Sequence, residues 1–205
     1  MGVTYDNKMT FKAHISQLAR TAAGKLASLR RISWLLDARG RELLYKSQVR
    51  SSLEYSCLAW GGAASSHLGL LDKIQRRAER IIRDDQQEQV TSLHSLQHRR
   101  NVAGLTVLYK AQQERVPHLI PLCQPCRRSE VTTRAVTLAP AALKVPRSNT
   151  SHHQRQFVQV YVRWWNKILA SDMCPDDPCV AEWSVQKFKV FVNKWLSERR
   201  DSDTI

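Results

Sequence analysis

LGLLDKIQRRAERIIR, residues 68–83, has the clearest helical periodicity in this chain of 205 residues. Successive residues of an α-helix are about 100° apart around the axis, so the apolar side chains of this stretch gather on one face. They are Leu68, Leu71, Ile74, Ala78, Ile81 and Ile82. The opposite face, called the basic stripe below, carries Lys73, Arg76, Arg77, Arg80 and Arg83. The pattern predicts an amphipathic helix with one face in a core and a cationic face outside it.

The basic stripe has two interpretations. Only Asp72 and Glu79 lie near enough in sequence to offset its charge, and the planar guanidinium of arginine suits phosphate because it donates two hydrogen bonds at once. A formal net charge of +14 for the whole chain also favours an anionic partner, most commonly nucleic acid. The alternative is an ordinary solvated face. No apolar run is long enough to cross a bilayer, so we expect no membrane partner.

The same reasoning along the chain predicts a mainly α fold. Apolar residues spaced by three and four predict helices near 11–36, 41–60, 66–83, 95–115, 154–169 and 184–198, and Gly2 to Tyr5 has short β character. Five prolines between residues 116 and 151 interrupt this helical spacing of apolar residues. We therefore expect a basic helical bundle over 1–115, a Pro-rich linker over 116–153 and a C-terminal helical segment over 154–205.

Several segments together resemble the C-terminal part of a reverse transcriptase from non-LTR retrotransposons of the LINE or jockey-like kind. GVTYDNKMTFKAHI (residues 2–15) resembles the end of the polymerase palm, and LLYKSQVRSSLEYSCLAW (43–60) resembles the next helix. LDKIQRRAERII (71–82), LHSLQHRRNVAGLTVLYK (93–110) and FVQVYVRWWNKIL (157–169) resemble later elements, the last with an aromatic-Asn pair. Two departures are Met1 where the family usually has Leu, and Ala170 where it often has Pro.

The resemblance implies a thumb-like bundle that grips the backbone of a template–primer duplex, RNA or DNA. The basic stripe is the first candidate for that contact, followed by Arg30, Arg31, Arg99 and Arg100. The family's palm binds divalent metal through aspartates, one pair of which follows an aromatic residue. Asp84-Asp85 follow Arg83 instead and read as a polar loop. We therefore expect a non-catalytic fragment that needs no cofactor.

Histidines and cysteines allow one metal hypothesis. His94, His98, Cys123 and Cys126 form an H-x3-H…C-x2-C pattern, which resembles the zinc-binding pattern of retroviral integrases. Two observations argue against a zinc site. Pro125 lies between the two cysteines, and His98 already belongs to a segment that resembles the polymerase thumb. The odd number of cysteines, five, predicts reduced thiols and hence the nucleus or cytoplasm.

Three alternatives to a non-catalytic nucleic-acid-binding fragment stay open at this point. The chain could be part of an active reverse transcriptase whose palm is supplied elsewhere, an HHCC-type zinc-binding module, or a translated relic with no activity.

Overall fold

The computed structural model describes residues 2–83, 93–114, 116–127, 141–171 and 183–198. These residues form helices and connecting segments, and the only β pairing among them is an isolated bridge between Cys126 and Leu143. The prediction of a mainly α fold is confirmed. The elements are α1 (Lys12–Ile32), η1 (Ser33–Leu35), α2 (Ala38–Leu44), η2 (Tyr45–Arg50), α3 (Ser51–Glu54), α4 (Cys57–Trp60), α5 (Ser65–Ile82), α6 (Leu96–Gln112), η3 (Pro117–Leu122), α8 (Ser151–Gln154), α9 (Phe157–Leu169) and α10 (Val185–Glu198).

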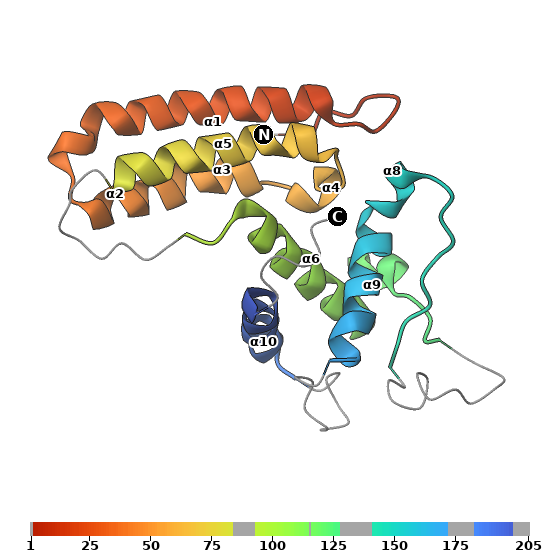
Figure 1. The fold of residues 1–205 in the computed structure, drawn as a ribbon. Helices are drawn as coiled ribbons and strands as arrows, with labels where there is room; N and C mark the ends of the chain where they lie inside the picture. Colours follow the sequence, from red (N-terminus) through yellow and green to blue (C-terminus); the bar gives the residue numbers. More distant parts are fainter. Residues whose placement is uncertain (1, 84–92, 115, 128–140, 172–182, 199–205) are drawn as a thin grey trace. The chain divides into compact units, whose positions relative to one another are not determined.

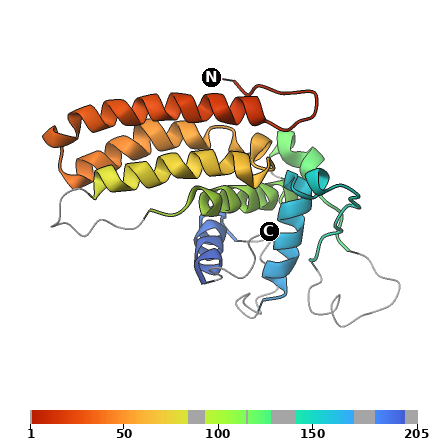
Figure 2. The ribbon, with the colours of Figure 1, turned by 45° about the horizontal axis from the view of Figure 1, so that its top comes forward.

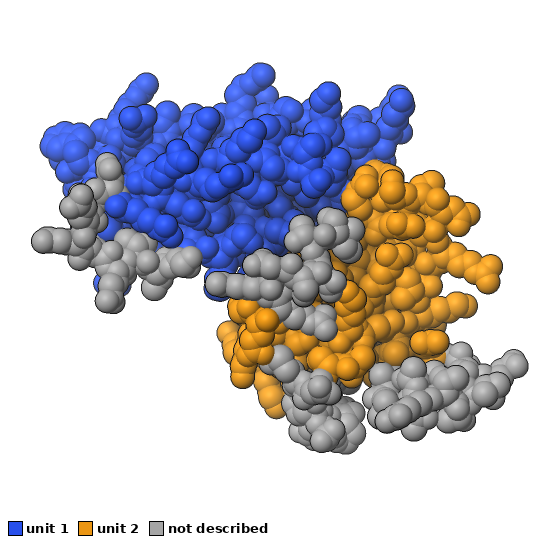
Figure 3. All heavy atoms as spheres, in the orientation of Figure 1, with its two compact units in different colours: residues 1–100 blue, residues 101–205 orange. Residues whose placement is uncertain are grey.

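The chain forms two compact units, residues 1–100 and 101–205 (Figure 3). The division falls inside α6, whose first turn belongs to unit 1 and whose remainder belongs to unit 2. The sequence-based boundaries at residues 115 and 153 differ from this division. The described parts of the proline-rich segment lie in unit 2 and include the short helices η3 and α8.

Unit 1 is a layer of three helical segments. Two views show α1, the α2–α3 segment and α5 lying side by side along their length (Figures 1 and 2). Their facing sides enclose one hydrophobic core, and its largest fully buried side chains include Tyr45, Trp60 and Leu71. Burial of this apolar surface stabilises the layer and fixes which face of each helix points outward.

The predicted helix over 41–60 is interrupted. Tyr45–Arg50 is one stretch of π-helix, and Ser56 adopts a left-handed backbone with φ of 51°, which separates α3 from α4. The indole Nε1 of Trp60 donates a hydrogen bond of 3.1 Å to the carbonyl oxygen of Tyr55, which the break leaves without its helical donor. The apolar spacing continues across the break, so periodicity alone predicted one helix.

The predicted N-terminal β segment is wrong. The described residues before α1 form no strand, because no partner strand lies beside them. Local hydrogen bonds shape this segment instead: the amide of Met9 bonds the carbonyl oxygen of Asp6 at 2.9 Å, and the amide of Thr10 bonds the Asp6 carboxylate at 2.6 Å. The amide of Thr4 donates to Nδ1 of the buried His14 at 3.3 Å.

Unit 2 is built on aromatic packing. Tyr109 of α6 stacks on Phe188 of α10, with ring centroids 4.2 Å apart, and its hydroxyl donates to the carbonyl oxygen of Trp183 at 2.6 Å. Trp165 of α9 packs against the same two rings. Aromatic pairs at such distances add to the energy of burial, so these side chains hold α6, α9 and α10 together.

Polar side chains of α9 hold the extended segment 141–146 alongside the helix. Asn166 accepts from the amide of Leu143 at 2.8 Å and donates to its carbonyl oxygen at 2.9 Å. Trp165 donates to Ala141 O at 3.2 Å, and Gln159 donates to Pro146 O at 2.9 Å. The aromatic-Asn pair of the sequence is therefore a structural element here, because its side chains replace the backbone partners that an extended segment would find in a sheet.

Candidate nucleic-acid interface

The basic stripe lies on the outer face of α5, as the periodicity predicted. Leu68, Leu71, Ile74, Ala78 and Ile82 are buried in the core of unit 1. All five stripe residues are exposed; they are Lys73, Arg76, Arg77, Arg80 and Arg83. The helix begins without a side-chain cap, so packing of its apolar face is the main source of its order. The cations therefore project from a packed, rigid support.

Acidic side chains on α5 do little to neutralise the stripe. Glu79 accepts from the Nε2 amide of the buried Gln75 at 3.0 Å. Asp72 is half-buried; burial raises the pKa of its carboxyl, while the nearby charges of Arg100 and Arg76 lower it. Within the described residues no ion pair joins a stripe side chain to a carboxylate. The stripe thus presents a nearly uncompensated cationic face to solvent.

Arg30 and Arg31 are exposed in the last turn of α1. The buried Arg41 shows where this turn lies relative to the stripe. Its Nε donates to Ser33 O at 2.9 Å and its Nη1 donates to Ile81 O at 3.4 Å. The ends of α1 and α5 therefore lie together, and Arg30 and Arg31 belong to the same end of unit 1 as Arg80 and Arg83.

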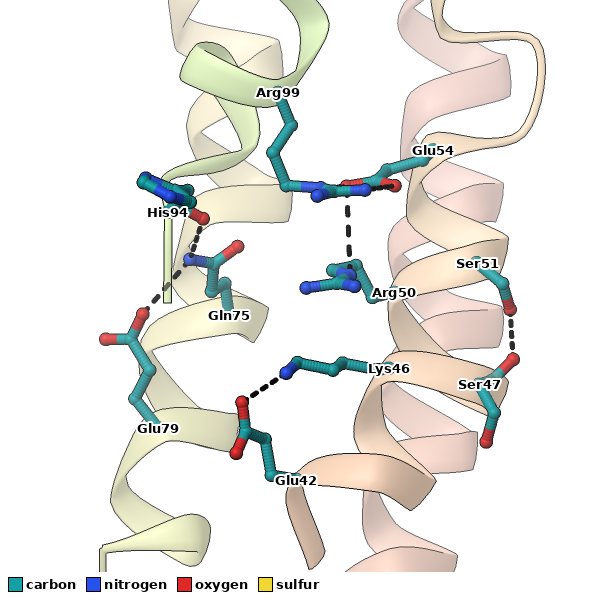
Figure 4. Close-up of polar contacts among 10 residues, drawn as sticks. All are labelled: Glu42, Lys46, Ser47, Arg50, Ser51, Glu54, Gln75, Glu79, His94 and Arg99. Atoms are coloured by element: carbon teal, nitrogen blue, oxygen red, sulfur yellow. Dashed lines mark hydrogen bonds and ion pairs between the residues drawn. The ribbon is translucent and has the colours of Figure 1, made fainter. Parts of the chain in front are cut away.

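Arg99, by contrast, is half-buried and already paired. It forms a two-pronged ion pair with Glu54 of α3, with Nη2 of Arg99 2.8 Å from Oε2 of Glu54 (Figure 4). The hydrogen bond to Glu54 raises the pKa of the Arg99 guanidinium, whereas burial and the charge of Arg99 lower that of neighbouring Arg50. Arg99 therefore joins the first turn of α6 to α3.

Arg100 is part of the interior, with only 3% of its surface exposed. Its guanidinium carbon lies 6.0 Å from the centroid of the Trp60 ring, and Nη2 donates to the side chain of Gln97 at 3.0 Å. A buried, stacked guanidinium cannot reach a phosphate without unpacking its surroundings. Of the second group of candidates, Arg30 and Arg31 are exposed, Arg99 is half-buried and paired with Glu54, and Arg100 is buried.

The four candidate zinc ligands fall into two pairs in different units. The rings of His94 and His98 stack with centroids 4.6 Å apart in unit 1. In unit 2, Sγ of Cys123 lies 3.4 Å from the side-chain amide of Gln112 and 3.7 Å from Oε1 of Glu114, and Cys126 is exposed. Burial and the charge of Glu114 raise the pKa of the Cys123 thiol, which opposes the thiolate that zinc needs. Across the described parts of the chain, no three His, Cys, Asp or Glu side chains come together as a metal site.

Asp84-Asp85 lie outside the described residues. None of the described helices is long and apolar enough to span a membrane.

Sequence reasoning missed one conspicuous feature of this end of unit 1. Trp34, in η1, is 77% exposed and lies beside the arginines of α1. The only signal in the sequence is an aromatic residue three positions after Arg31, a position that helical periodicity assigns to no particular face once the helix has ended.

Comparison with known proteins confirms the resemblance to non-LTR retrotransposon reverse transcriptases. Over 88 residues, 40% of the chain, it is 30% identical to a probable RNA-directed DNA polymerase from transposon X-element of Drosophila melanogaster. It is 34% identical over 88 residues to the RNA-directed DNA polymerase from mobile element jockey of the same organism. The match spans 9% of the length of each relative. No protein-family model and no solved structure matches the chain.

These relatives correct one expectation. Both are named as polymerases, which are enzymes, and this contradicts the prediction that the chain is not an enzyme but a non-catalytic fragment. That prediction was based on the palm aspartates, which the sequence does not show, and an enzyme's separate structural regions need not each carry its catalytic residues.

Proposed function

We propose that this chain is part of an RNA-directed DNA polymerase of a non-LTR retrotransposon and that unit 1 grips the backbone of the template–primer duplex. The observation that carries the proposal is the basic stripe: five exposed cations on one face of a helix whose other face is packed into a core. The two curated relatives support the polymerase class, because both act on nucleic acid by name.

The grip is electrostatic and independent of sequence. Arginine and lysine contacts to phosphate release condensed counterions, and this release supplies much of the binding energy. Such contacts fix the position of the duplex but do not read its bases. The rigid support matters because little backbone order must be created when the duplex binds. Arg30 and Arg31 extend the contact at the end of α5, and the complex acts in the nucleus or cytoplasm.

A salt titration tests the proposal. The full chain and the variant Arg76→Ala/Arg77→Ala/Arg80→Ala are titrated with a fluorescent RNA–DNA duplex of fixed length at several salt concentrations. The variant should fold normally, because all three side chains are exposed. It should bind every sequence more weakly, and the slope of log K against log salt should become shallower by about one unit for each lost phosphate contact.

The matched control is Lys8→Ala/Lys12→Ala/Arg20→Ala, which removes three exposed cations of unit 1 from the segment before α1 and the first half of α1. It carries the same change in net charge, so it should weaken binding far less if the stripe makes specific contacts with phosphate. Equal losses of affinity in the two triple variants would show that the stripe contributes only through the net charge of the protein. An unchanged slope in the folded stripe variant would refute the proposal and favour a relic without activity.

A further inference from the structure

An exposed apolar cluster marks the junction of α1 and α2 in unit 1. Three apolar side chains are exposed there: Ile32 by 41%, Trp34 by 77% and Leu35 by 64%; Leu43, in the last turn of α2, is exposed by 68%. Trp34 is the most exposed of the large apolar side chains among the described residues. Contiguous exposed apolar side chains usually mark a binding surface.

The indole of Trp34 is held in one orientation. Its Nε1 donates a hydrogen bond of 3.1 Å to the carbonyl oxygen of Arg31, one turn earlier in the chain. The polar edge of the ring is therefore engaged by the protein, and the apolar surface of the ring is left to solvent. A flat, exposed and already oriented ring is the kind of platform on which nucleobases stack.

Arg41 connects this platform to the basic stripe. Its buried guanidinium bonds the carbonyl oxygen of Ser33, next to Trp34, and that of Ile81 in the last turn of α5. The turn that carries Trp34 is thereby tied to the part of α5 from which Arg80 and Arg83 project. The platform lies at the end of the stripe.

The charges around the platform are mainly positive. Arg30, Arg31 and Arg39, all within five residues of Trp34 in the sequence, are exposed. The acidic side chains of α2 and its cap are engaged: Asp37 accepts from the amide of Gly40 at 2.8 Å, and Glu42 pairs with Lys46. An aromatic ring among arginines fits single-stranded nucleic acid, whose phosphates and bases alternate. A partner protein for the apolar cluster would need an acidic rim.

We propose that Trp34 stacks on an unpaired base of the nucleic acid whose duplex portion lies along the basic stripe. The inference rests on the proposed grip and adds the form of the ligand: a duplex that continues into a single strand, with Arg30 and Arg31 holding the phosphates beside the stacked base. Base–aromatic stacking tolerates any base, so this contact, like the grip, is independent of sequence.

The test compares two ligands and four proteins. A blunt duplex and the same duplex with a single-stranded extension of about six nucleotides are bound by the wild-type full chain, Trp34→Ala, Trp34→Phe and Leu43→Ala at one salt concentration. Trp34→Ala should weaken binding of the extended duplex about tenfold, from the energy of one stacked base, and should leave the blunt duplex nearly unchanged. Trp34→Phe should retain most of the affinity. Leu43→Ala, which removes an equally exposed apolar side chain, should retain all of it.

Each other outcome overturns the inference. Full affinity of Trp34→Ala for the extended duplex would show that no base stacks there, and equal losses for Trp34→Ala and Leu43→Ala would assign the cluster to a general apolar contact. Binding of the wild type, but not of Trp34→Ala, to vesicles with an anionic headgroup, without discrimination between the two duplexes, would assign it to lipid. Failure of the proposed grip looks different: the wild type would then bind neither duplex, or the stripe variant would keep its salt slope.

Discussion

Replacing Gly104 with alanine tests the packing between α6 and α9. A Cβ atom at this position would lie 2.0 Å from Cζ of Tyr161, and 2.3 and 2.4 Å from its two Cε atoms. Carbon atoms in contact are about 3.5–4.0 Å apart, so the ring or the helix must move by more than about 1 Å. Tyr161 is only 8% exposed and has little room. Such overpacking costs about 1–3 kcal/mol or more, against a gain of about 1 kcal/mol in helix propensity.

We therefore expect Gly104→Ala to lower the free energy of unfolding of unit 2 by about 1 kcal/mol or more. Because the chain has two units, the measurement is hydrogen exchange of amides in α6 and α9 as a function of denaturant, which follows unit 2 by itself. Gly24→Ala is the matched control: it lies in α1, and a Cβ there would meet nothing within 4 Å. It should stabilise unit 1 by about 1 kcal/mol. A Gly104→Ala protein as stable as the wild type would refute this account of the α6–α9 contact.

Two further predictions concern single side chains. Asn166→Asp should destabilise unit 2 by about 1–3 kcal/mol and speed hydrogen exchange of the Leu143 amide. A carboxylate oxygen would then face the Leu143 carbonyl oxygen that Nδ2 of Asn166 now bonds. Unchanged protection of the Leu143 amide would contradict this prediction. Burial lowers the pKa of His14, so the unfolded chain binds a proton near pH 6.5 that folded unit 1 does not. The stability of unit 1 should therefore fall as the pH decreases from about 7 to 5, and His14→Gln should flatten this dependence in denaturant titrations; an equal slope in both proteins would exclude His14 as the cause.

The features predictable from sequence are those that local periodicity determines. The two faces of α5 follow from residues three and four apart, and the structure keeps both. The break at Ser56 does not follow, because the hydrogen bond from Trp60 to Tyr55 compensates it without disturbing the apolar spacing. The prediction of an N-terminal β segment was wrong because β propensity is a local property, whereas a strand needs a partner strand, which the described residues lack.

The roles of individual arginines were the hardest to predict. Arg76 and Arg99 are chemically identical and both stand in runs of basic residues on helices. One is exposed, and the other is paired with Glu54, which lies 45 residues away in the sequence. Only the packing of the first turn of α6 against α3 distinguishes them, so candidate sets drawn from charge runs mix surface cations with buried ones.

The spacing of the basic stripe has a consequence for movement. Its cations follow one another at intervals of three, one, three and three residues, so they advance by about 4.5, 1.5, 4.5 and 4.5 Å along the axis of α5, whereas successive phosphates of one strand advance about 3.4 Å along a duplex axis. The two periods do not coincide, so no single placement of a duplex along the stripe engages every cation at its best distance. A shift by one base pair then loses some contacts and gains others, and the energy changes little. If the proposed grip holds, such a track would keep a nucleic acid from dissociating while offering little resistance to sliding.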